Sequence, residues 1–377
     1  MTTVRRIRGY KTKLVLSDKE RAWCWQCAGA ARWCYNWGLD AMKTAHEQGR
    51  KTSAWAEKKR LNGIKDDVAP WLRESPYIVL QTAFDNLDAA YQNFFRRVKG
   101  GDTPGYPKFK SRKQPRQAFG LRDDIRVSEK KIKLPRIGWL RLAEHGYLPM
   151  SKNARILYAT IVTQNHGDTW YVSLQVEETV SEPVPATDCP LGIDLGIKSL
   201  AVVSDGTVYE NVRPLRSAEQ RIARLSRELA RRNKGSQNWL KTKAKLNKAH
   251  EKARNTRQHY LHQISAETVA KRPSVIVMEN LNVKGMMANR HLSRAIADLG
   301  MYELRRQMGY KAEWTGSRLL LADRWEPSSK RCSECGAVKE TLSLNERTYV
   351  CSECGSILDR DLNAARNLAA LALSQPA

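Results

Sequence analysis

The stretch "PLGIDLGIKSLAVVSDGTVYENV", residues 190–212, sets short apolar runs between turn residues and carries a carboxylate inside its first run. This pattern predicts a strand around Asp194, a turn at Gly196, a second strand over 199–204 and, after the "DG" turn, a third short strand. A carboxylate in a buried strand is costly unless it has a partner. Asp194 therefore either closes a turn or belongs to a site that uses its charge.

Two other acids occur in similar settings further along the chain. "PSVIVMENL" predicts a buried strand that ends in Glu279, and "DRDLNAARNL" predicts a helix that begins near Asp361. Taken singly, Glu279 reads as a strand-end charge and Asp361 as a helix cap, although Asp359 suits the capping role better. If the fold brings Asp194, Glu279 and Asp361 together, they form an all-oxygen site suited to Mg²⁺ or Mn²⁺. Two such ions, about 3.5–4 Å apart, would clamp the attacking and leaving oxygens of a phosphodiester.

The composition of the chain favours nuclease chemistry at such a site. Lys and Arg outnumber Asp and Glu by 65 to 39, and the net charge of +26 favours a polyanionic partner over a basic enzyme with scattered lysines. The 377 residues are enough for two or three domains. No apolar run reaches the length of a membrane span, and the start lacks the apolar stretch of a secretory signal. We therefore expect a cytoplasmic protein with no membrane partner.

Four of the eight cysteines have the spacing of a zinc site. Two "CSEC" motifs, 332–335 and 351–354, are separated by fifteen residues, and a glycine follows each of them. This spacing predicts two knuckles that complete a closed tetrahedral shell around one structural Zn²⁺, held by Cys332, Cys335, Cys351 and Cys354. Two disulfides are the alternative, which a reducing compartment disfavours. A further pair in "CWQC", with Cys34, has helical spacing and reads as buried small hydrophobic residues.

The N-terminal half alternates between strand and helix patterns. Residues 4–16 predict a strand, 18–99 predict helices with Ser17 or Asp18 as the first cap, and 99–116 predict a basic loop. The last of these helices has an apolar face with a 3.6-residue period, formed by Leu80, Phe84, Leu87, Tyr91, Phe94 and Val98. Short strands follow, with "NHGD" as a hairpin turn, and 181–190 read as a linker. We expect a small β-barrel or sandwich to which the N-terminal strand returns, with the helices inserted between.

A long basic segment follows the Asp194 strands. Residues 213–254 hold fourteen Lys or Arg against three acids, and "NKGSQN" divides the helical pattern into a hairpin. A solvated coiled-coil face is the alternative interpretation, but such faces mix charges of both signs. A surface that follows a phosphate backbone fits this composition better.

These motifs, in this order, resemble the TnpB proteins of insertion sequences, which are relatives of the type V CRISPR effectors. The resemblance rests on "GIDLGIKSLAVVSDG", "ENL" after an apolar strand, "PSSKRCSECG", "YVCSECG" and "DRDLNAARN", and more loosely on "GYPKFKSR" in the N-terminal half. It implies a multidomain α+β fold: an RNase H-like (RuvC) nuclease core with an inserted zinc ribbon, and an N-terminal β-barrel with a helical insertion. The expected domains are a wedge-like barrel at 1–16 and 113–185, a helical recognition domain at 17–112, and a nuclease domain at 186–377 with a basic hairpin at 213–270 and the ribbon at 328–357.

The resemblance also implies an activity and its partners. Asp194, Glu279 and Asp361 would be the catalytic acids and would hold Mg²⁺ or Mn²⁺, as two ions. A guide RNA from the transposon end would pair with one strand of a double-stranded DNA target, while the protein, a monomer with its RNA, reads a short flanking motif. Gln81 could contact an adenine edge, or could be an ordinary helix-surface residue. The expected nucleic-acid contacts are Tyr77, Gln81, Arg224, Arg231, Arg232, Lys241, Lys245 and Arg366. Asn363, like Arg366, lies within about a turn of Asp361 and could contact the scissile strand.

Three other functions remain open from the sequence. An RNA-guided regulator that binds without cutting usually lacks one of the acids, and this chain has all three. A carboxylate-triad transposase would need no guide RNA. A plain zinc-ribbon nucleic-acid-binding module would leave the two strand-borne acids unexplained.

Overall fold

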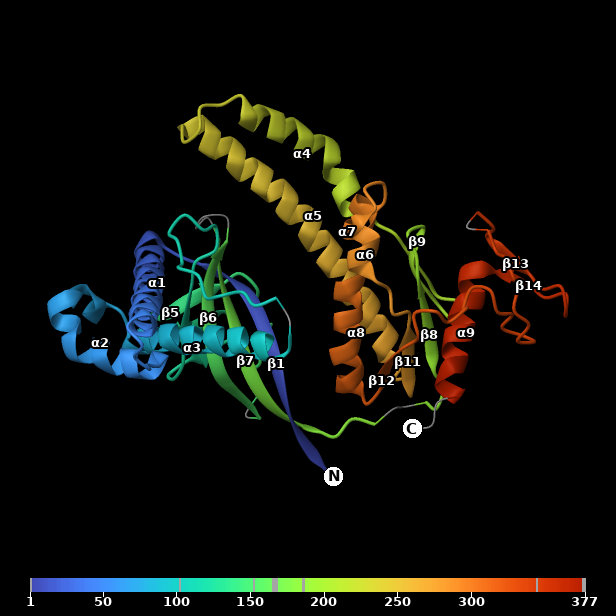
Figure 1. Ribbon diagram of the computed structural model, residues 1–377, viewed down its shortest axis with the longest axis horizontal. Helices are drawn as coiled ribbons and strands as arrows, with labels where there is room; N and C mark the ends of the chain where they lie inside the picture. Colours follow the sequence, from blue (N-terminus) through green and yellow to red (C-terminus); the bar gives the residue numbers. More distant parts are fainter. Residues whose placement is uncertain are drawn as a thin grey trace. The chain divides into compact units, whose positions relative to one another are not determined.

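The computed structural model describes residues 2–101, 103–151, 153–164, 169–184, 187–343 and 345–374 (Figure 1). The chain forms two compact units, Met1–Ser181 and Glu182–Ala377. Within the described ranges, no helix is both long enough and apolar enough to cross a membrane.

One antiparallel sheet organises the first unit. Its seven strands lie in the order β2-β6-β7-β1-β5-β4-β3. The predicted N-terminal strand is confirmed: β1 pairs with β7 from Thr3–Ser181 to Leu14–Trp170, and with β5 at its end. The outermost strands β2 and β3 are not hydrogen-bonded to each other among the described residues, so a closed barrel stays a prediction. The strands are β1 (Thr3–Val15), β2 (Ala118–Leu121), β3 (Arg126–Val127), β4 (Lys131–Leu134), β5 (Gly138–Leu142), β6 (Ala154–Gln164) and β7 (Thr169–Ser181).

The helices between β1 and β2 share one core with this sheet. They are α1 (Asp18–Glu47), α2 (Ala54–Val68), the short 3-10 helix η1 (Pro70–Glu74) and α3 (Tyr77–Lys99). Ser17 caps α1 in a capping box with Glu20, as the sequence indicated. The predicted apolar face of α3 is buried as far as Tyr91, but Val98 is exposed, because the last turn of α3 extends beyond the core.

Two further sequence predictions for this unit concern the cysteines of α1 and the "NHGD" turn. Cys24, Cys27 and Cys34 are fully buried in α1 as free thiols, and burial raises the pKa of each thiol, so they act as small hydrophobic residues. The "NHGD" turn lies outside the described residues, although the strands on either side of it, β6 and β7, pair up to Gln164–Thr169.

The second unit contains a mixed five-stranded sheet in the order β10-β9-β8-β11-β12. The predicted strand, turn, strand, turn, strand around Asp194 is confirmed as β8, β9 and β10, which pair antiparallel. On the other side of β8, the strands β11 and β12 run parallel to it. The bounds are β8 (Leu191–Leu195), β9 (Ser199–Val203), β10 (Val208–Glu210), β11 (Val275–Met278) and β12 (Arg318–Leu321).

Helices cover both faces of this sheet (Figure 1). Alternate residues of a strand point to opposite faces. Ile276 and Met278 therefore join the core shared with α5 and α8, whereas Val275 and Val277 join the one shared with α9. The helices are α4 (Pro214–Ala230), α5 (Gln237–Ala270), α6 (Val283–Ala288), α7 (Ser293–Leu299), α8 (Met301–Thr315) and α9 (Arg360–Ser374).

Gly192 allows α9 to lie directly on β8. A Cβ atom at this position would be 1.9 Å from the carbonyl oxygen of Ala365 and 2.5 Å from the nitrogen of Ala369. Only a residue without a side chain permits this approach of helix backbone to strand. The contact fixes where α9 sits along β8.

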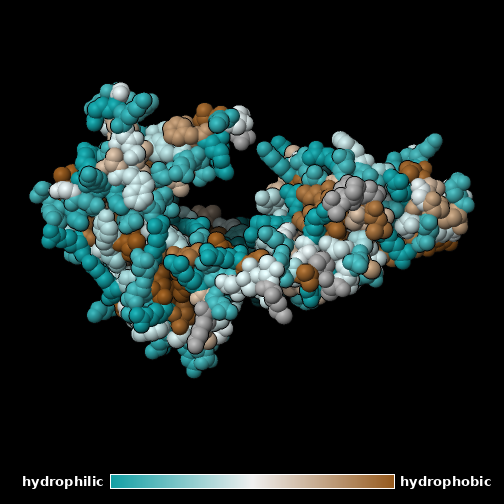
Figure 2. All heavy atoms as spheres, turned by 90° about the horizontal axis from the view of Figure 1, so that it is seen from below, coloured by the Kyte–Doolittle hydropathy of each residue, from teal (hydrophilic) through white to brown (hydrophobic). Residues whose placement is uncertain are grey.

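Two insertions extend from this core. The predicted basic hairpin is confirmed as α4 and α5, which pack against each other. The carboxylate of Asp298 in α7 caps α4 by accepting hydrogen bonds from the N–H groups of Leu215 (3.0 Å) and Arg216 (3.3 Å). The second insertion is the ribbon between β12 and α9, with the short antiparallel pair β13 (Thr348–Val350) and β14 (Ile357–Asp359). On the face drawn in Figure 2, hydrophilic residues dominate the surface, as the basic composition leads one to expect.

Candidate active site and zinc knuckles

Strand alternation places two of the predicted acids on the same face of the second sheet. Gly192 faces α9, so Asp194, two residues later, faces it as well. Val277 also faces α9, and Glu279 follows it by two residues. In the parallel pairing, Met278 lies opposite Ile193, so the next residues, Glu279 and Asp194, are neighbours at the carboxyl ends of their strands. Carboxyl ends of parallel strands are the usual place for a site in an α/β sheet.

The third acid reaches the same edge from α9. The Gly192 contact is with Ala365, and Asp361 lies one turn earlier on the same side of the helix. The helix therefore begins beside the carboxyl end of β8. Asp359 accepts hydrogen bonds from the N–H groups of Asp361 (2.9 Å) and Leu362 (3.0 Å), which confirms its capping role and leaves the Asp361 carboxylate free of that task.

The electrostatics show that the three carboxylates affect one another. Burial raises the pKa of Asp194 well above its usual range, and the charges of Glu279 and Asp361 raise it further. Burial and the charge of Asp361 also raise the pKa of Glu279, although a hydrogen bond from Ser328 opposes the shift. Two buried acids with raised pKa values beside a third carboxylate form a site that a cation would complete.

Ser328 supports this site and was not singled out by the sequence. Its hydroxyl lies 3.4 Å from the Oε1 atom of Glu279, and the residue is buried. Ser328 sits just before the first cysteine knuckle, so this contact connects the knuckles to the carboxylates. The only hint in the sequence was the polar "PSSK" before Cys332, a motif without a distinctive spacing.

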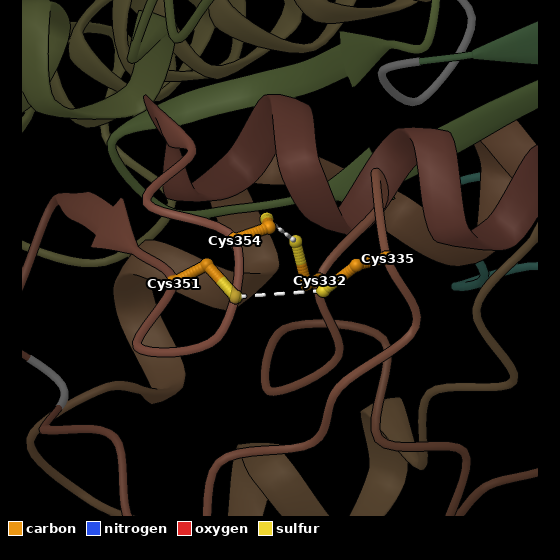
Figure 3. Close-up of side chains that lie close together, drawn as sticks. All are labelled: Cys332, Cys335, Cys351 and Cys354. Atoms are coloured by element: carbon orange, nitrogen blue, oxygen red, sulfur yellow. Dashed lines mark hydrogen bonds between the residues drawn. The ribbon is translucent and has the colours of Figure 1, made fainter.

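The four predicted zinc ligands form a compact cluster (Figure 3). Among the described residues, theirs is the one group of three or more metal-ligating side chains whose ligand atoms all lie within 4.8 Å of one another. The sulfur of Cys332 is 3.7 Å from that of Cys354, and Cys335 is 3.6 Å from Cys351. Sulfurs around a tetrahedral zinc with bonds of 2.3 Å are about 3.8 Å apart, whereas a disulfide bond is about 2.05 Å long. All four are free thiols, so the disulfide alternative is excluded.

The backbone of the knuckles also suits a metal. Gly336 and Gly355 have φ values of 79° and 72°, the left-handed conformation that glycine adopts without strain. Backbone N–H groups of Cys354 and Glu353 lower the pKa of the Cys351 thiol, whereas the neighbouring thiols of the cluster raise the pKa of Cys335 and Cys354. Positive charge from a metal would favour the thiolate form of all four.

Two buried asparagines connect the knuckles to α9. Asn363 accepts a hydrogen bond from the N–H of Ser333 (2.9 Å) and donates one to the carbonyl of Arg331 (2.7 Å). Asn367 donates to the carbonyls of Ser328 and Arg331. The prediction that Asn363 reaches the substrate is therefore wrong, because its side chain is fully buried against the ribbon.

The predicted nucleic-acid contacts fall into three places. Arg224 on α4 and Arg231, which directly follows this helix, are exposed, and Arg232 pairs with Glu228. With Arg227 these side chains line a hollow of about 430 Å³. Lys241 and Lys245 are exposed on α5. Arg366 on α9 pairs with Glu334 at 3.0 Å. In the first unit, Tyr77 begins α3 and is exposed, and Gln81 lies one turn later and is half-buried.

Three family models match parts of the chain. Residues 173–290 match a family described as "Probable transposase" (OrfB_IS605), residues 302–368 match the Cas12f1-like TNB domain, and residues 1–51 match a helix-turn-helix domain. In the structure, the last range holds β1 and the single long helix α1.

Close relatives cover almost the whole chain. A Streptomyces pristinaespiralis protein, provisionally named an RNA-guided DNA endonuclease, is 33% identical over 98% of this chain and 90% of its own length. An Escherichia coli K12 protein, provisionally named RNA-guided DNA endonuclease InsQ, is 32% identical over 97% of this chain and 92% of its own. Among solved structures, a Cas12f1 chain in complex with guide RNA and target DNA aligns with a TM-score of 0.56 over 94% of this chain and 83% of that chain, at 15% identity, which supports the fold.

Proposed function

Because the chain belongs to the TnpB family, we infer that it is an RNA-guided DNA endonuclease. The observation that carries this inference is that three carboxylates, from β8, from the end of β11 and from the start of α9, lie at one edge of the second sheet. Their oxygens are not all within 4.8 Å of one another, but the charges of Glu279 and Asp361 are near enough to raise the pKa of Asp194. Relatives that match nearly the full length support the same activity.

The carboxylates fit divalent metal ions. Their donor set is all oxygen, and burial together with neighbouring carboxylate charge raises the pKa values of Asp194 and Glu279, so added positive charge would stabilise their ionised forms. We propose that Asp194, Glu279 and Asp361 hold Mg²⁺ or Mn²⁺, as two ions. When bound, such ions supply an activated water and neutralise charge on the phosphate that is cut.

The chain's own residues would position the reacting groups. Ser328 holds the Glu279 carboxylate from the ribbon side. The Asp359 cap satisfies the first N–H groups of α9, so the Asp361 carboxylate remains available to the site. The four-cysteine cluster would hold one structural Zn²⁺ and, through Asn363, fix the start of α9.

We further propose the two nucleic-acid partners. A guide RNA from the transposon end would pair with the target strand, and a short flanking motif of the double-stranded DNA would be read by the first unit, with Tyr77 and Gln81 at the start of α3. The exposed arginines of the α4–α5 hairpin would contact phosphates. The working complex would be one protein chain with one RNA.

Substitution of single acids tests the catalytic assignment. The RNA that copurifies with the protein is sequenced, and cleavage is measured on a target library with randomised flanks. Asp194→Ala, Glu279→Ala and Asp361→Ala should each lower the cleavage rate by roughly a thousandfold or more, because each removes a ligand of the metal site. Binding to the guided target should persist, since base pairing supplies it.

Asp205→Asn is the matched control. Asp205 is a carboxylate of the same sheet that lies in the β9–β10 turn and pairs with Lys271, so its loss should leave cleavage intact. An Asp194→Ala protein that still cuts would refute the site. Guided binding by the wild type without cleavage would instead indicate a regulator, and strand transfer without copurified RNA would indicate a transposase.

A further inference from the structure

The loop between β12 and the first knuckle presents an exposed tryptophan beside the carboxylates. Trp325 has 85% of its surface exposed, the most of the chain's eleven tryptophans, all of which are described. Within the part of the chain that the structure describes, its indole makes no ring contact, cation contact or hydrogen bond. A single exposed apolar side chain is common on protein surfaces, so its position must carry the inference.

Both ends of this loop are attached to the end of β11. On one side, the N–H of Ala322 donates to the carbonyl of Met278 at 2.9 Å. On the other side, the hydroxyl of Ser328 contacts the Glu279 carboxylate. Trp325 is three residues from each of these attachments. Three extended residues span at most about 11 Å, so the backbone of Trp325 stays within that distance of both points beside the site.

The loop is also ordered by its own hydrogen bonds. Asp323 accepts from the N–H of Trp325 (2.8 Å) through its side chain and from the N–H of Glu326 (3.2 Å) through its carbonyl. Glu326 in turn pairs with Arg331 at 3.0 Å. A large aromatic ring is thus exposed to solvent at the tip of a hydrogen-bonded loop, although burying this ring would stabilise the fold more than leaving it exposed.

We propose that Trp325 stacks on an unpaired base of the DNA strand bound at the carboxylate site, and so sets which phosphodiester lies there. A strand at that site is a polyanion whose bases, once unwound, offer flat faces for stacking. The exposed Arg324, which precedes Trp325 in the chain, adds positive charge for the DNA backbone. With about 3.4 Å per nucleotide along a stacked strand, the contacted base lies within about three nucleotides of the cut. This inference rests on the proposed function.

Substitutions that keep or remove the aromatic ring test the proposal. Trp325→Leu removes the π-face but keeps an apolar side chain, and Trp325→Phe keeps a ring. Cleavage is measured with the protein–RNA complex and a guided target at subsaturating DNA. We expect W325L to cut at least about tenfold more slowly than the wild type, because stacking on one base contributes that factor to affinity. W325F should cut at close to the wild-type rate, because it keeps an aromatic ring. Trp139→Leu, which removes an exposed tryptophan of β5 in the first unit, is the control and should cut normally.

An abasic scan gives a readout that a general loss of stability cannot imitate. A single abasic nucleotide is moved along the cut strand. The wild type should slow at one position near the cut, and W325L should show no such dependence, because the ring and the base act as a pair. Independently of catalysis, 5-iodouracil at that position should photocrosslink to an Asp194→Ala complex in EDTA and lose the crosslink in the Asp194→Ala, Trp325→Leu double variant.

The outcomes separate this inference from the proposed function. A wild type that cuts, together with a W325L protein of equal rate and equal abasic profile, overturns the role of Trp325 alone. A wild type that does not cut guided DNA overturns both. A W325L protein that is slower than the wild type by the same factor at every abasic position, and so keeps the wild-type minimum near the cut, also contradicts the proposal, because it indicates a general loss of activity.

Discussion

Asp194 lies in an environment that opposes the charge of its side chain. It lies in the central strand β8 of its sheet, almost fully buried, and two other carboxylates raise its pKa further. Such an acid binds its proton more tightly in the folded chain than in the unfolded chain, where its pKa is about 3.9. The free energy of unfolding therefore decreases as the pH rises from that value towards the raised pKa of the folded chain, and the metal-free protein loses stability over this range.

Asp194→Asn should therefore stabilise the metal-free protein. The amide is neutral, so it removes the buried charge and its repulsion of Glu279 and Asp361. In EDTA at neutral pH, we expect the Tm of the variant to exceed that of the wild type by a few degrees. Added Mg²⁺ should then raise the Tm of the wild type more than that of the variant, because ligand binding to the folded state stabilises it.

The same substitution at Asp205 should have the opposite effect. Burial tends to raise the pKa of Asp205, but Lys271 and Thr207 outweigh it and hold the pKa below its usual value. Ionised Asp205 thus stabilises the fold above the unfolded pKa, and Asp205→Asn should lower the Tm. If Asp194→Asn lowered the Tm in EDTA as well, the carboxylates would not repel each other as the structure indicates.

Neighbouring residues of "DRDLNAARNL" show what a sequence can and cannot assign at this scale. The capping role of Asp359 could be predicted, because a cap depends only on residues next to it in the chain. Asn363 was expected to face the substrate but is buried against Arg331 and Ser333. Its partners lie some thirty residues away, and no local pattern indicates which side of a helix a distant loop will cover.

At the scale of elements, the ribbon and α9 act together. The knuckles lie between β12 and α9. Asn363 and Asn367 of the helix donate hydrogen bonds to the carbonyl of Arg331, in the segment that leads into the first knuckle. Ser328, in the same segment, contacts Glu279. The cluster of cysteines can thus hold two of the three carboxylates in place without touching either.

Removal of one cysteine should therefore abolish cleavage as well as metal binding. The wild type should contain about one zinc per chain, and Cys351→Ser should contain almost none, because a structural site needs all four ligands. We expect the variant to lose cleavage although its three acids are unchanged. Zinc is measured by metal analysis, and cleavage on the guided target.

Cys189→Ser supplies the comparison, since Cys189 is an exposed thiol outside the cluster. It should keep both zinc and activity. A Cys351→Ser protein that retains full cleavage after losing zinc would show that the ribbon does not position α9.

The elements themselves could largely be predicted, but the sheet of the first unit could not be fully specified. The strands around Asp194, the basic hairpin and the knuckles follow from periodicity, turn residues and cysteine spacing. The return of β1 to β7 was expected, yet closure of a barrel depends on pairing between β2 and β3, which no local pattern encodes. Val98 likewise continues the apolar period of α3 but lies beyond the core.

At the scale of the whole molecule, charge is the dominant property. The net charge of +26 is not spread evenly, since Arg224 and Arg227 of α4 and Arg231 at its C-terminal end line the same hollow. Among the described residues, the side chains of Arg224 and Arg231 have no ion-pair partner, unlike Arg232. Unpaired arginines on a rigid hairpin are available to phosphates, and each phosphate contact releases counterions.

Neutralising these two arginines should therefore change how binding depends on salt. The affinity of the protein–RNA complex for guided DNA is measured over a series of salt concentrations. In the Arg224→Gln, Arg231→Gln double variant, the negative slope of log affinity against log salt should become shallower by about 0.7–0.9 for each lost DNA phosphate contact. Arg306→Gln is the control, because Arg306 is paired with Glu303 and should leave the slope unchanged. If the double variant kept the wild-type slope for DNA but lost affinity for the RNA, the α4–α5 hairpin would bind the guide rather than the target. Unchanged slopes for DNA and for RNA would show that the hairpin is not part of the nucleic-acid surface.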